Sequence, residues 1–196
     1  MRTASRIKRF IAKLQPNQMF TTRELLSFGL RNQIDQTTHK LVKIGTLHRV
    51  ARGVFVIAGS DLTLITPAKV ATVKAESFNR QIVEHATDAG RRLGIEASRA
   101  NPGPTFSTRA RSSSFLERIT YTRIYFHGVS ARKFTLAGSA LGDILRALWN
   151  LTEKGLTDEA LDRAALLMNA SHRAQLSAFA SLIPEWLHAC FAFAWA

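Results

Sequence analysis

The feature that most constrains the fold is the stretch 21–56, where two short helical patterns are followed directly by two apolar strand patterns. Thr21 and Glu24 stand three residues apart, just before Leu25. This is the spacing of a capping box, in which the threonine oxygen accepts a backbone hydrogen bond and the glutamate reaches back. Gly29 follows, and glycine ends helices readily because it enters the left-handed conformation at low cost. The pattern therefore predicts a short helix that ends at Gly29.

A second helix is predicted from an N-cap at Asn32, with Asp35 in its first turn, to Gly45. At about 100° per residue, its two faces differ in chemistry. The inner face is predicted to hold Ile34, Thr38, Leu41, Val42 and Ile44. The outer face is predicted to hold Asn32, Gln33, Gln36, His39, Lys40 and Lys43, and Arg31 lies just before the helix. Amides and cations suit base edges and phosphates, so these seven residues are the candidate DNA-binding set of this helix.

Two short strands, 47–50 and 54–57, follow and are joined through residues 51–53, which predicts a ribbon with Arg49 and Arg52 at its tip. Helix, helix and ribbon in this order are typical of a winged helix-turn-helix. A polar helix face is most often simply solvated. The order of elements, the basic tip and the lack of acid at the centre of the outer face favour DNA binding here. His39 is predicted to lie on the surface or at a phosphate rather than to read a base.

The formal charge of +13 is unevenly spread along the chain. Residues 1–52 hold eleven Lys and Arg against two acids, and residues 91–133 hold nine against two. The segments between and after these blocks are slightly acidic. An excess of this size indicates a polyanionic partner.

The flanking patterns predict an α+β protein with two domains. An amphipathic helix over 5–14 and a short strand at 19–20, paired with the ribbon, complete a winged helix-turn-helix domain at 1–58. Residues 59–196 are predicted to form a mixed α/β domain with a helical C-terminal end.

Within the second domain, helices are predicted from Thr66-Pro67 to about residue 80 and over 88–93, where Gly94 follows. Residues 101–104 predict a turn. Segments rich in aromatic and β-branched residues predict strands at 81–85, 106–111, 120–127 and 132–136. Later helices are predicted to begin at the caps Thr157 and Ser171 and at Pro184, after an apolar stripe around 141–149.

A second group of cations gathers in the central stretch. Its members are Arg109, Arg111, Arg123, Arg132 and Lys133. Either they solvate one face of a sheet, or they form a second basic surface for DNA or for an acidic protein. Both interpretations stay open on the sequence.

No pattern predicts catalysis, so the chain is interpreted as a non-enzyme without a metal or a cofactor. There is no glycine-rich phosphate loop and no pair of Cys or His at metal-ligand spacing. His85 with Asp88, and His127, are more often structural hydrogen-bonding groups than acid–base catalysts. The single cysteine, Cys190, is predicted to be a buried apolar residue. The apolar stretch 186–196 is about half the length of a membrane-spanning helix, so we expect a cytoplasmic protein without membrane contact.

The sequence resembles the AbiEi-type antitoxins of bacterial type IV toxin–antitoxin systems over most of its length. The most specific marks are the R-V-x-R-G pattern at 49–53 and A-L-W at 147–149, and Thr38, Lys40 and Phe55 depart mildly from the pattern. The resemblance implies a winged helix followed by a second, α/β-type domain. It also implies a non-enzymatic antitoxin that represses its own promoter and counteracts a nucleotidyltransferase-like toxin, without a stable complex being required.

Three alternatives remain on the sequence. The first is a stand-alone winged-helix regulator. The second is an enzyme that processes nucleic acid and uses the winged helix to bind its substrate. The third is an interaction module whose winged helix binds protein. No segment predicts a dimer interface, and the operator and the toxin are not given by the sequence.

Overall fold

The computed structural model describes residues 2–96 and 103–194 and has an α+β fold. The chain divides into two compact units. Unit 1 comprises Met1–Gln81 and Ser113–Tyr125, and unit 2 comprises Ile82–Ser112 and Phe126–Ala196. This division falls after Gln81 rather than after residue 58, and the segment Ser113–Tyr125 returns to the first unit.

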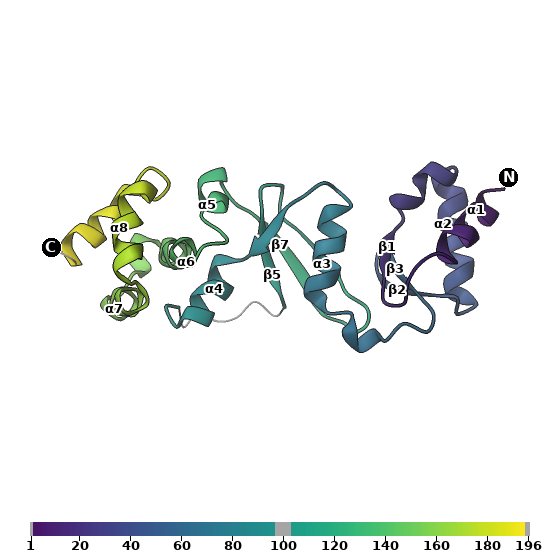
Figure 1. The fold of residues 1–196 in the computed structure, drawn as a ribbon, viewed down its shortest axis with the longest axis horizontal. Coiled ribbons are helices and arrows are strands. Elements are labelled where there is room, and N and C mark those ends of the chain that lie inside the picture. Colours follow the sequence, from purple (N-terminus) through teal and green to yellow (C-terminus); the bar gives the residue numbers. More distant parts are fainter. Residues whose placement is uncertain (1, 97–102, 195–196) are drawn as a thin grey trace. The chain divides into compact units, whose positions relative to one another are not determined.

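Unit 1 begins with the expected order of elements. These are α1 (Thr3–Ile11), β1 (Met19–Thr21), the 3-10 helix η1 (Glu24–Phe28), α2 (Arg31–Lys43), β2 (Leu47–Ala51) and β3 (Val54–Ile57). The strands form an antiparallel sheet of order β1-β3-β2, in which Phe20 and Arg49 are both register partners of Phe55. Figure 1 shows α1 and α2 on one side of this sheet. The predicted pairing of a short strand at Met19 with the ribbon is confirmed.

The core of this part is apolar and continuous from the helices to the sheet. Ile7 of α1, Leu25 of η1, Ile34 of α2 and Phe20 of β1 are fully buried, and the rings of Phe20 and Phe55 stack 5.7 Å apart. Burying each such side chain contributes roughly 1.5–3 kcal/mol. The inner face of α2 is therefore fixed by packing, and its orientation is fixed with it.

The first predicted helix forms, but its details differ from the prediction. It is a 3-10 helix, and Gly29 has φ 166°, which is extended and not left-handed. A Cβ at Gly29 would lie 2.3 Å from the Thr3 hydroxyl, so glycine is needed here for the close approach of α1. Glu24 does reach back, accepting from the Thr21 backbone N–H at 2.7 Å. The Thr21 hydroxyl, however, donates to the same carboxylate instead of capping the helix.

The ends of α2 were predicted only in part. The N-cap is Leu30 rather than Asn32, which lies one residue inside the helix. At the other end Gly45 has φ 74°, and Thr46 N–H donates to Leu41 O at 2.9 Å, as in a Schellman motif. Ile44 is 70% exposed, so its assignment to the inner face was wrong. It follows the last helical residue, where the chain already leaves the helical path.

The rest of unit 1 brings a distant segment back to the ribbon. It contains η2 (Leu62–Leu64), α3 (Pro67–Glu76), β6 (Ser113–Leu116) and the start of β7 (Arg123–Gly128). Thr66 caps α3 as predicted, accepting from Lys69 N–H at 3.3 Å. Strand β6 was not predicted from the sequence. Beyond it, Glu117 forms an antiparallel bridge with Ala51 at the edge of β2.

Unit 2 combines part of the second sheet, whose strand order is β4-β5-β7-β6, with helices. Its elements are β4 (Ile82–Glu84), α4 (Ala86–Leu93), β5 (Thr105–Thr108), the end of β7, α5 (Ala131–Thr135), α6 (Ala140–Gly155), α7 (Asp158–Leu167), α8 (Ala170–Phe179) and α9 (Glu185–Ala194). Its core is built on α6, whose Leu141, Leu145 and Leu148 are buried, and α4 lies beside α6 (Figure 1).

Two predictions in unit 2 were wrong. The predicted strand 132–136 is the helix α5, because the Ser130 hydroxyl accepts from Lys133 N–H at 3.3 Å and starts a helix. The cap of α8 is Asn169 rather than Ser171, with His172 N–H donating to the amide oxygen at 2.8 Å. Residues 101 and 102 of the predicted turn lie outside the described residues. No helix in the described part of the chain is long and apolar enough to cross a membrane.

Candidate nucleic-acid interface

The outer face of α2 is solvent-exposed over its whole length. All seven candidate residues of the helix are exposed, namely Arg31, Asn32, Gln33, Gln36, His39, Lys40 and Lys43. At 3.6 residues per turn, all of them except Arg31 fall within about 60° of Gln36 around the helix axis. The structure therefore brings six predicted residues together on one face, with Gln36 at its centre.

Some polar groups of this face are already engaged. The Thr3 hydroxyl donates to Gln33 Oε1 at 2.8 Å, which ties the face to α1. Arg31 Nε pairs with Asp35 at 2.9 Å, so the single acid of the helix has its charge offset. Both members of this pair are exposed, so it contributes at most about 1 kcal/mol to stability.

The remaining groups of the face are available to a partner. Among the residues that the structure describes, the side chains of Gln36, His39, Lys40 and Lys43 have no hydrogen-bond or ion-pair partner. Together they offer an amide that both donates and accepts, an imidazole and two ammonium groups. A helix face of this chemistry fits an anionic surface with hydrogen-bonding edges.

The turn between β2 and β3 presents Arg52 to solvent. Gly53, with φ 77°, makes the turn, and Lys74 of α3 donates from Nζ to Arg52 O at 2.6 Å. Burial, and then the neighbouring charge of Arg52, lower the pKa of Lys74. This bond from Lys74 stabilises the turn. The sequence pattern did not predict it, because it depends on contact between α3 and the ribbon.

Arg49, predicted at the tip with Arg52, lies further back on β2. It is half-buried, and its guanidinium lies over the Phe55 ring, 5.5 Å from the centroid. Its Nε is buried without a hydrogen-bond partner in the described part of the chain. The exposed cation of the ribbon tip is therefore Arg52.

Of the five central cations, Arg123 belongs to unit 1 and the other four belong to unit 2. Arg123 is exposed in unit 1 and donates to Ser114 Oγ at 3.3 Å, whereas Arg109 and Arg111 are exposed in unit 2. Arg132 and Lys133 instead gather around Trp149, 5.7 and 5.5 Å from its ring centroid.

The last two cations are bonded within unit 2, where Arg132 is exposed and Lys133 is half-buried. Arg132 donates to the carbonyls of Leu182 and Ile183, at 3.2 and 2.8 Å. Lys133 Nζ donates to Asn150 Oδ1 at 3.4 Å. Burial, followed by the charge of Arg146, lowers the pKa of Lys133, with Glu96 acting in the opposite direction.

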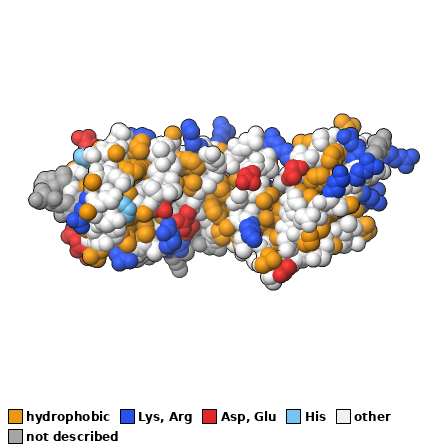
Figure 2. Space-filling model, viewed as in Figure 1, with side chains coloured by type: hydrophobic (Ala, Val, Ile, Leu, Met, Phe, Trp, Pro, Cys, Tyr) orange, Lys and Arg blue, Asp and Glu red, His pale blue; other side chains and the backbone are white. Residues whose placement is uncertain are grey.

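The charge of the protein is concentrated in unit 1. This unit holds 16 Lys and Arg against 5 Asp and Glu, while unit 2 holds 11 against 9. Figure 2 shows Lys and Arg side chains gathered over the α1 and α2 end of unit 1. On α1 the exposed cations include Arg6, Lys8 and Arg9, and the exposed Lys13 follows the helix.

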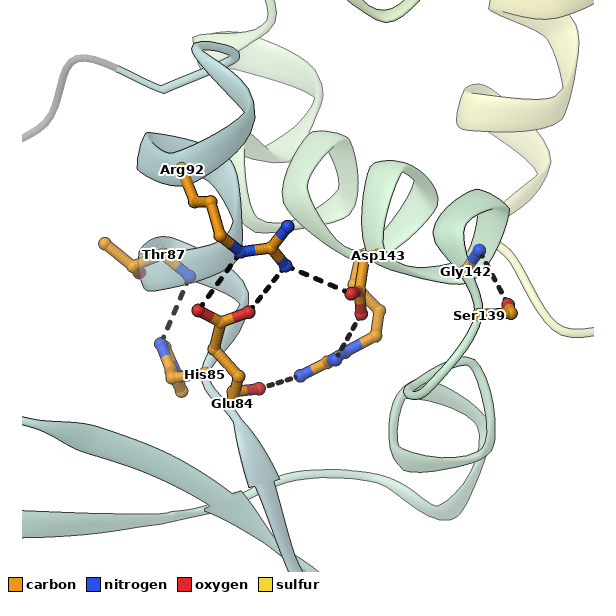
Figure 3. A network of polar contacts seen from close by, with 8 residues as sticks. Glu84, His85, Thr87, Arg92, Ser139, Gly142 and Asp143 are labelled. Atoms are coloured by element: carbon orange, nitrogen blue, oxygen red, sulfur yellow. Dashed lines mark hydrogen bonds and ion pairs between the residues drawn. The ribbon is translucent and has the colours of Figure 1, made fainter. Parts of the chain in front are cut away.

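Four charged residues of unit 2 form a network of ion pairs and hydrogen bonds (Figure 3). Arg92 pairs with Glu84 at 2.7 Å and with Asp143 at 3.2 Å. Arg146, which is 1% exposed, pairs with Asp143 at 3.1 Å and donates to the backbone carbonyl of Glu84. Burial lowers the pKa of Arg146, and the charge of Asp143 works against that shift. This arrangement joins β4, α4 and α6.

The two histidines considered for acid–base chemistry contact one another. Thr87 N–H donates to His85 Nδ1 at 3.3 Å, so His85 caps α4, and the rings of His85 and His127 lie 5.0 Å apart. Burial, then the charges of His127, Lys133 and Arg146, lower the pKa of His85 to about 4. Asp88, the imagined partner of His85, pairs with Arg91. Across residues 2–96 and 103–194, no group of three or more His, Cys, Asp or Glu side chains is placed to hold a metal ion.

Comparison with known proteins adds no assignment to this geometry. No protein-family model matches the chain, and no curated protein matches it.

Proposed function

We propose that the first part of unit 1 is a winged helix-turn-helix and that the protein binds double-stranded DNA in a sequence-specific manner. One observation carries this proposal. Helix α2 is fixed by a buried inner face, while its outer face offers the free amide of Gln36 and free cationic groups, and the β2–β3 turn of the same unit exposes Arg52.

The dimensions of α2 suit the major groove, which is about 12 Å wide and admits a helix. Asn32 and Gln36 carry the amide groups that pair with an adenine edge, and Lys40 and Lys43 suit guanine or phosphate. Arg52 would contact the backbone or the minor groove from the ribbon. The concentration of charge in unit 1 supports the same assignment, because neutralising phosphates supplies most of the non-specific affinity for DNA.

Within that class, we propose a repressor of its own promoter that acts as the antitoxin of a type IV system against a nucleotidyltransferase-like toxin. The support for this role is the sequence resemblance. The nearly balanced charge of unit 2 is compatible with a part that does not bind DNA. A regulator without a toxin is the alternative, and it shares the same DNA-binding chemistry.

The test of DNA binding is a titration of the full chain with the duplex upstream of its own gene and with a scrambled duplex, over a salt series. We expect a preference of roughly a thousandfold or more near physiological salt, the usual gap between specific and non-specific binding. Equal binding that collapses as salt rises would overturn sequence specificity. Absence of binding at low salt would favour a protein-binding module, and cleavage of the duplex that EDTA abolishes would favour an enzyme.

The antitoxin role is tested by co-expression with the product of the neighbouring reading frame. We expect growth to be restored by the native chain and also by a Gln36→Ala/Arg52→Ala double variant, because counteracting the toxin does not require the promoter. No restoration by the native chain would leave the regulator alternative.

A further inference from the structure

The residues 117–122, here called the stapled loop, lie next to the ribbon of unit 1. They connect β6 with β7 and come more than sixty positions after the ribbon in sequence. Glu117 bridges Ala51, and Arg118 N–H donates to Val50 O at 2.8 Å. Ala51 immediately precedes Arg52, so this loop is attached to the strand that leads into the exposed basic turn.

A buried carboxylate holds the loop in one conformation. Glu117 is 0% exposed, and its carboxylate accepts from the Ile119 N–H, from the Thr120 N–H at 2.9 Å and from the Thr120 hydroxyl at 2.6 Å. The Glu117 N–H donates to Thr122 O at 2.9 Å and closes the loop. Burial of a carboxylate is unfavourable unless hydrogen bonds satisfy it, and here three donors do so.

Two side chains of the loop are left to solvent. Tyr121 is 77% exposed and has φ 53°, a left-handed conformation that is strained for a tyrosine. Arg118 is exposed, and its guanidinium has no hydrogen-bond or ion-pair partner among the described residues. Neither side chain is needed for packing, although the hydrogen bonds of Glu117 fix the backbone that carries both of them. A rigid loop that presents a guanidinium and a phenol is suited to binding.

We propose that Arg118 and Tyr121 bind the phosphate backbone of double-stranded DNA beside the phosphates that Arg52 contacts, so that the stapled loop extends the contact of the ribbon. This inference rests on the proposed function. Neighbouring strands lie roughly 5 Å apart, so the loop and the β2–β3 turn face the same short stretch of a bound duplex. A guanidinium pairs with phosphate in a forked geometry, and a tyrosine hydroxyl donates to phosphate oxygen.

The chemistry of the surroundings favours DNA over an acidic protein as the partner. The loop belongs to the unit with 16 cations against 5 acids, and its one carboxylate is buried. Its bridge partner Ala51 is followed directly by the exposed Arg52, the cation assigned to DNA. Polar and cationic groups, rather than an apolar patch, dominate what the loop offers.

The position of the loop on DNA is tested by site-directed cleavage with the full chain. Because Cys190 is the single cysteine, a Cys190→Ser background accepts one new cysteine carrying iron–EDTA, introduced by Gln36→Cys, Arg52→Cys, Tyr121→Cys or, as a control in unit 2, Gln175→Cys. On the upstream duplex, we expect the Tyr121→Cys probe to cut next to the positions cut from Arg52→Cys, and the Gln175→Cys probe not to cut there. Cuts from Gln36→Cys and Arg52→Cys without cuts from Tyr121→Cys would overturn the inference alone. Absence of cuts from all of them would overturn the proposed function.

The energetic role of the loop is tested by the salt dependence of binding. Arg118→Ala is expected to weaken binding several-fold and to reduce the slope of log K against log salt by about one. Arg118→Lys, which keeps the charge, is expected to retain the slope. Lys154→Ala removes an equal charge from an exposed position of unit 2 and is expected to leave the slope unchanged. Equal slopes for Arg118→Ala and Lys154→Ala would contradict the phosphate contact.

Discussion

The two units differ in how several of their cations are used. In unit 1, Lys40, Lys43 and Arg52 extend into solvent without side-chain partners among the described residues. In unit 2, Arg146 is buried between the Asp143 carboxylate and the Glu84 carbonyl, and Arg132 donates to the carbonyls of Leu182 and Ile183, just before α9. The same residue types thus stay unpartnered in the first unit and are engaged within the fold in the second.

This difference teaches that a formal charge of +13 is not by itself a measure of DNA-binding surface. A cation whose donors are satisfied within the fold contributes to stability but offers little to a ligand. The comparison can also be measured, because all three tryptophans, Trp149, Trp186 and Trp195, belong to unit 2. Tryptophan fluorescence therefore reports on unit 2, and the proposed DNA binding would report on unit 1.

The largest effect is expected from Arg146→Ala. Breaking a buried ion pair typically costs about 3–5 kcal/mol, and the loss here should lie at the lower end of that range because Asp143 keeps its pair with Arg92. We expect the urea midpoint followed by tryptophan fluorescence to fall accordingly. The matched control is Arg163→Ala, which removes an exposed arginine with one bond to Leu93 O. A loss no larger than that of the control would mean that the network of Figure 3 is not structural.

In unit 1, the variant Gln36→Ala at the centre of the α2 face is expected to change DNA binding rather than stability. A good bidentate contact is worth about 1–3 kcal/mol of discrimination, so the preference for the upstream duplex over the scrambled one should fall roughly 5- to 150-fold. Unfolding should change by less than about 0.5 kcal/mol, because Gln36 is exposed and unpartnered within the described residues. Gln175→Ala, an exposed glutamine on α8, is the control that should change neither quantity. An unchanged preference would remove Gln36 from the interface.

A pH effect is expected in unit 2 from His85. Its folded-state pKa is about 4, below the ordinary value of 6.5, so the unfolded chain binds the proton first as the pH falls. Stability is therefore fully present above pH 6.5 and is lost progressively between 6.5 and 4. For a partly exposed group we expect roughly 1–2 kcal/mol over this window.

The variant that isolates this effect is His85→Asn. Asparagine keeps an acceptor for the Thr87 N–H at the start of α4 but does not titrate. Its fluorescence-detected stability should depend less on pH between 6.5 and 4 than that of the native chain. Parallel pH profiles for the two proteins would exclude His85 as the source.

Local patterns predicted much of unit 1 because its helices and ribbon are organised by short-range signals. The inner positions Ile34, Thr38 and Leu41 follow from helical periodicity, and they are buried. Ile44 continues the same period and is exposed, because the helix ends before it. The exposure of the α2 face was predictable, but the Thr3–Gln33 bond and the support from Lys74 were not, since both depend on tertiary contacts.

Unit 2 was less predictable because its segments have competing signals. The segment 132–136 has strand-forming residues, yet the cap at Ser130 makes it helical. The sequence also cannot tell that the exposed Arg132 donates to carbonyls some fifty positions away, so these bonds were not predicted. The return of Ser113–Tyr125 to unit 1 was not predictable either, because the bridge between Ala51 and Glu117 has no local sequence signature.

The smallest expected effect comes from removing one exposed arginine in each unit. It tests the difference between the two units most directly. Arg52→Ala should weaken binding to the upstream and scrambled duplexes alike and lower the salt slope by about one, since a phosphate contact carries no sequence information. Arg109→Ala removes the same charge from an exposed position of unit 2. If only Arg52→Ala lowers the slope, the DNA footprint belongs to unit 1. If both variants lower the slope, the central cations of unit 2 contribute a second phosphate contact, and both units belong to the DNA footprint.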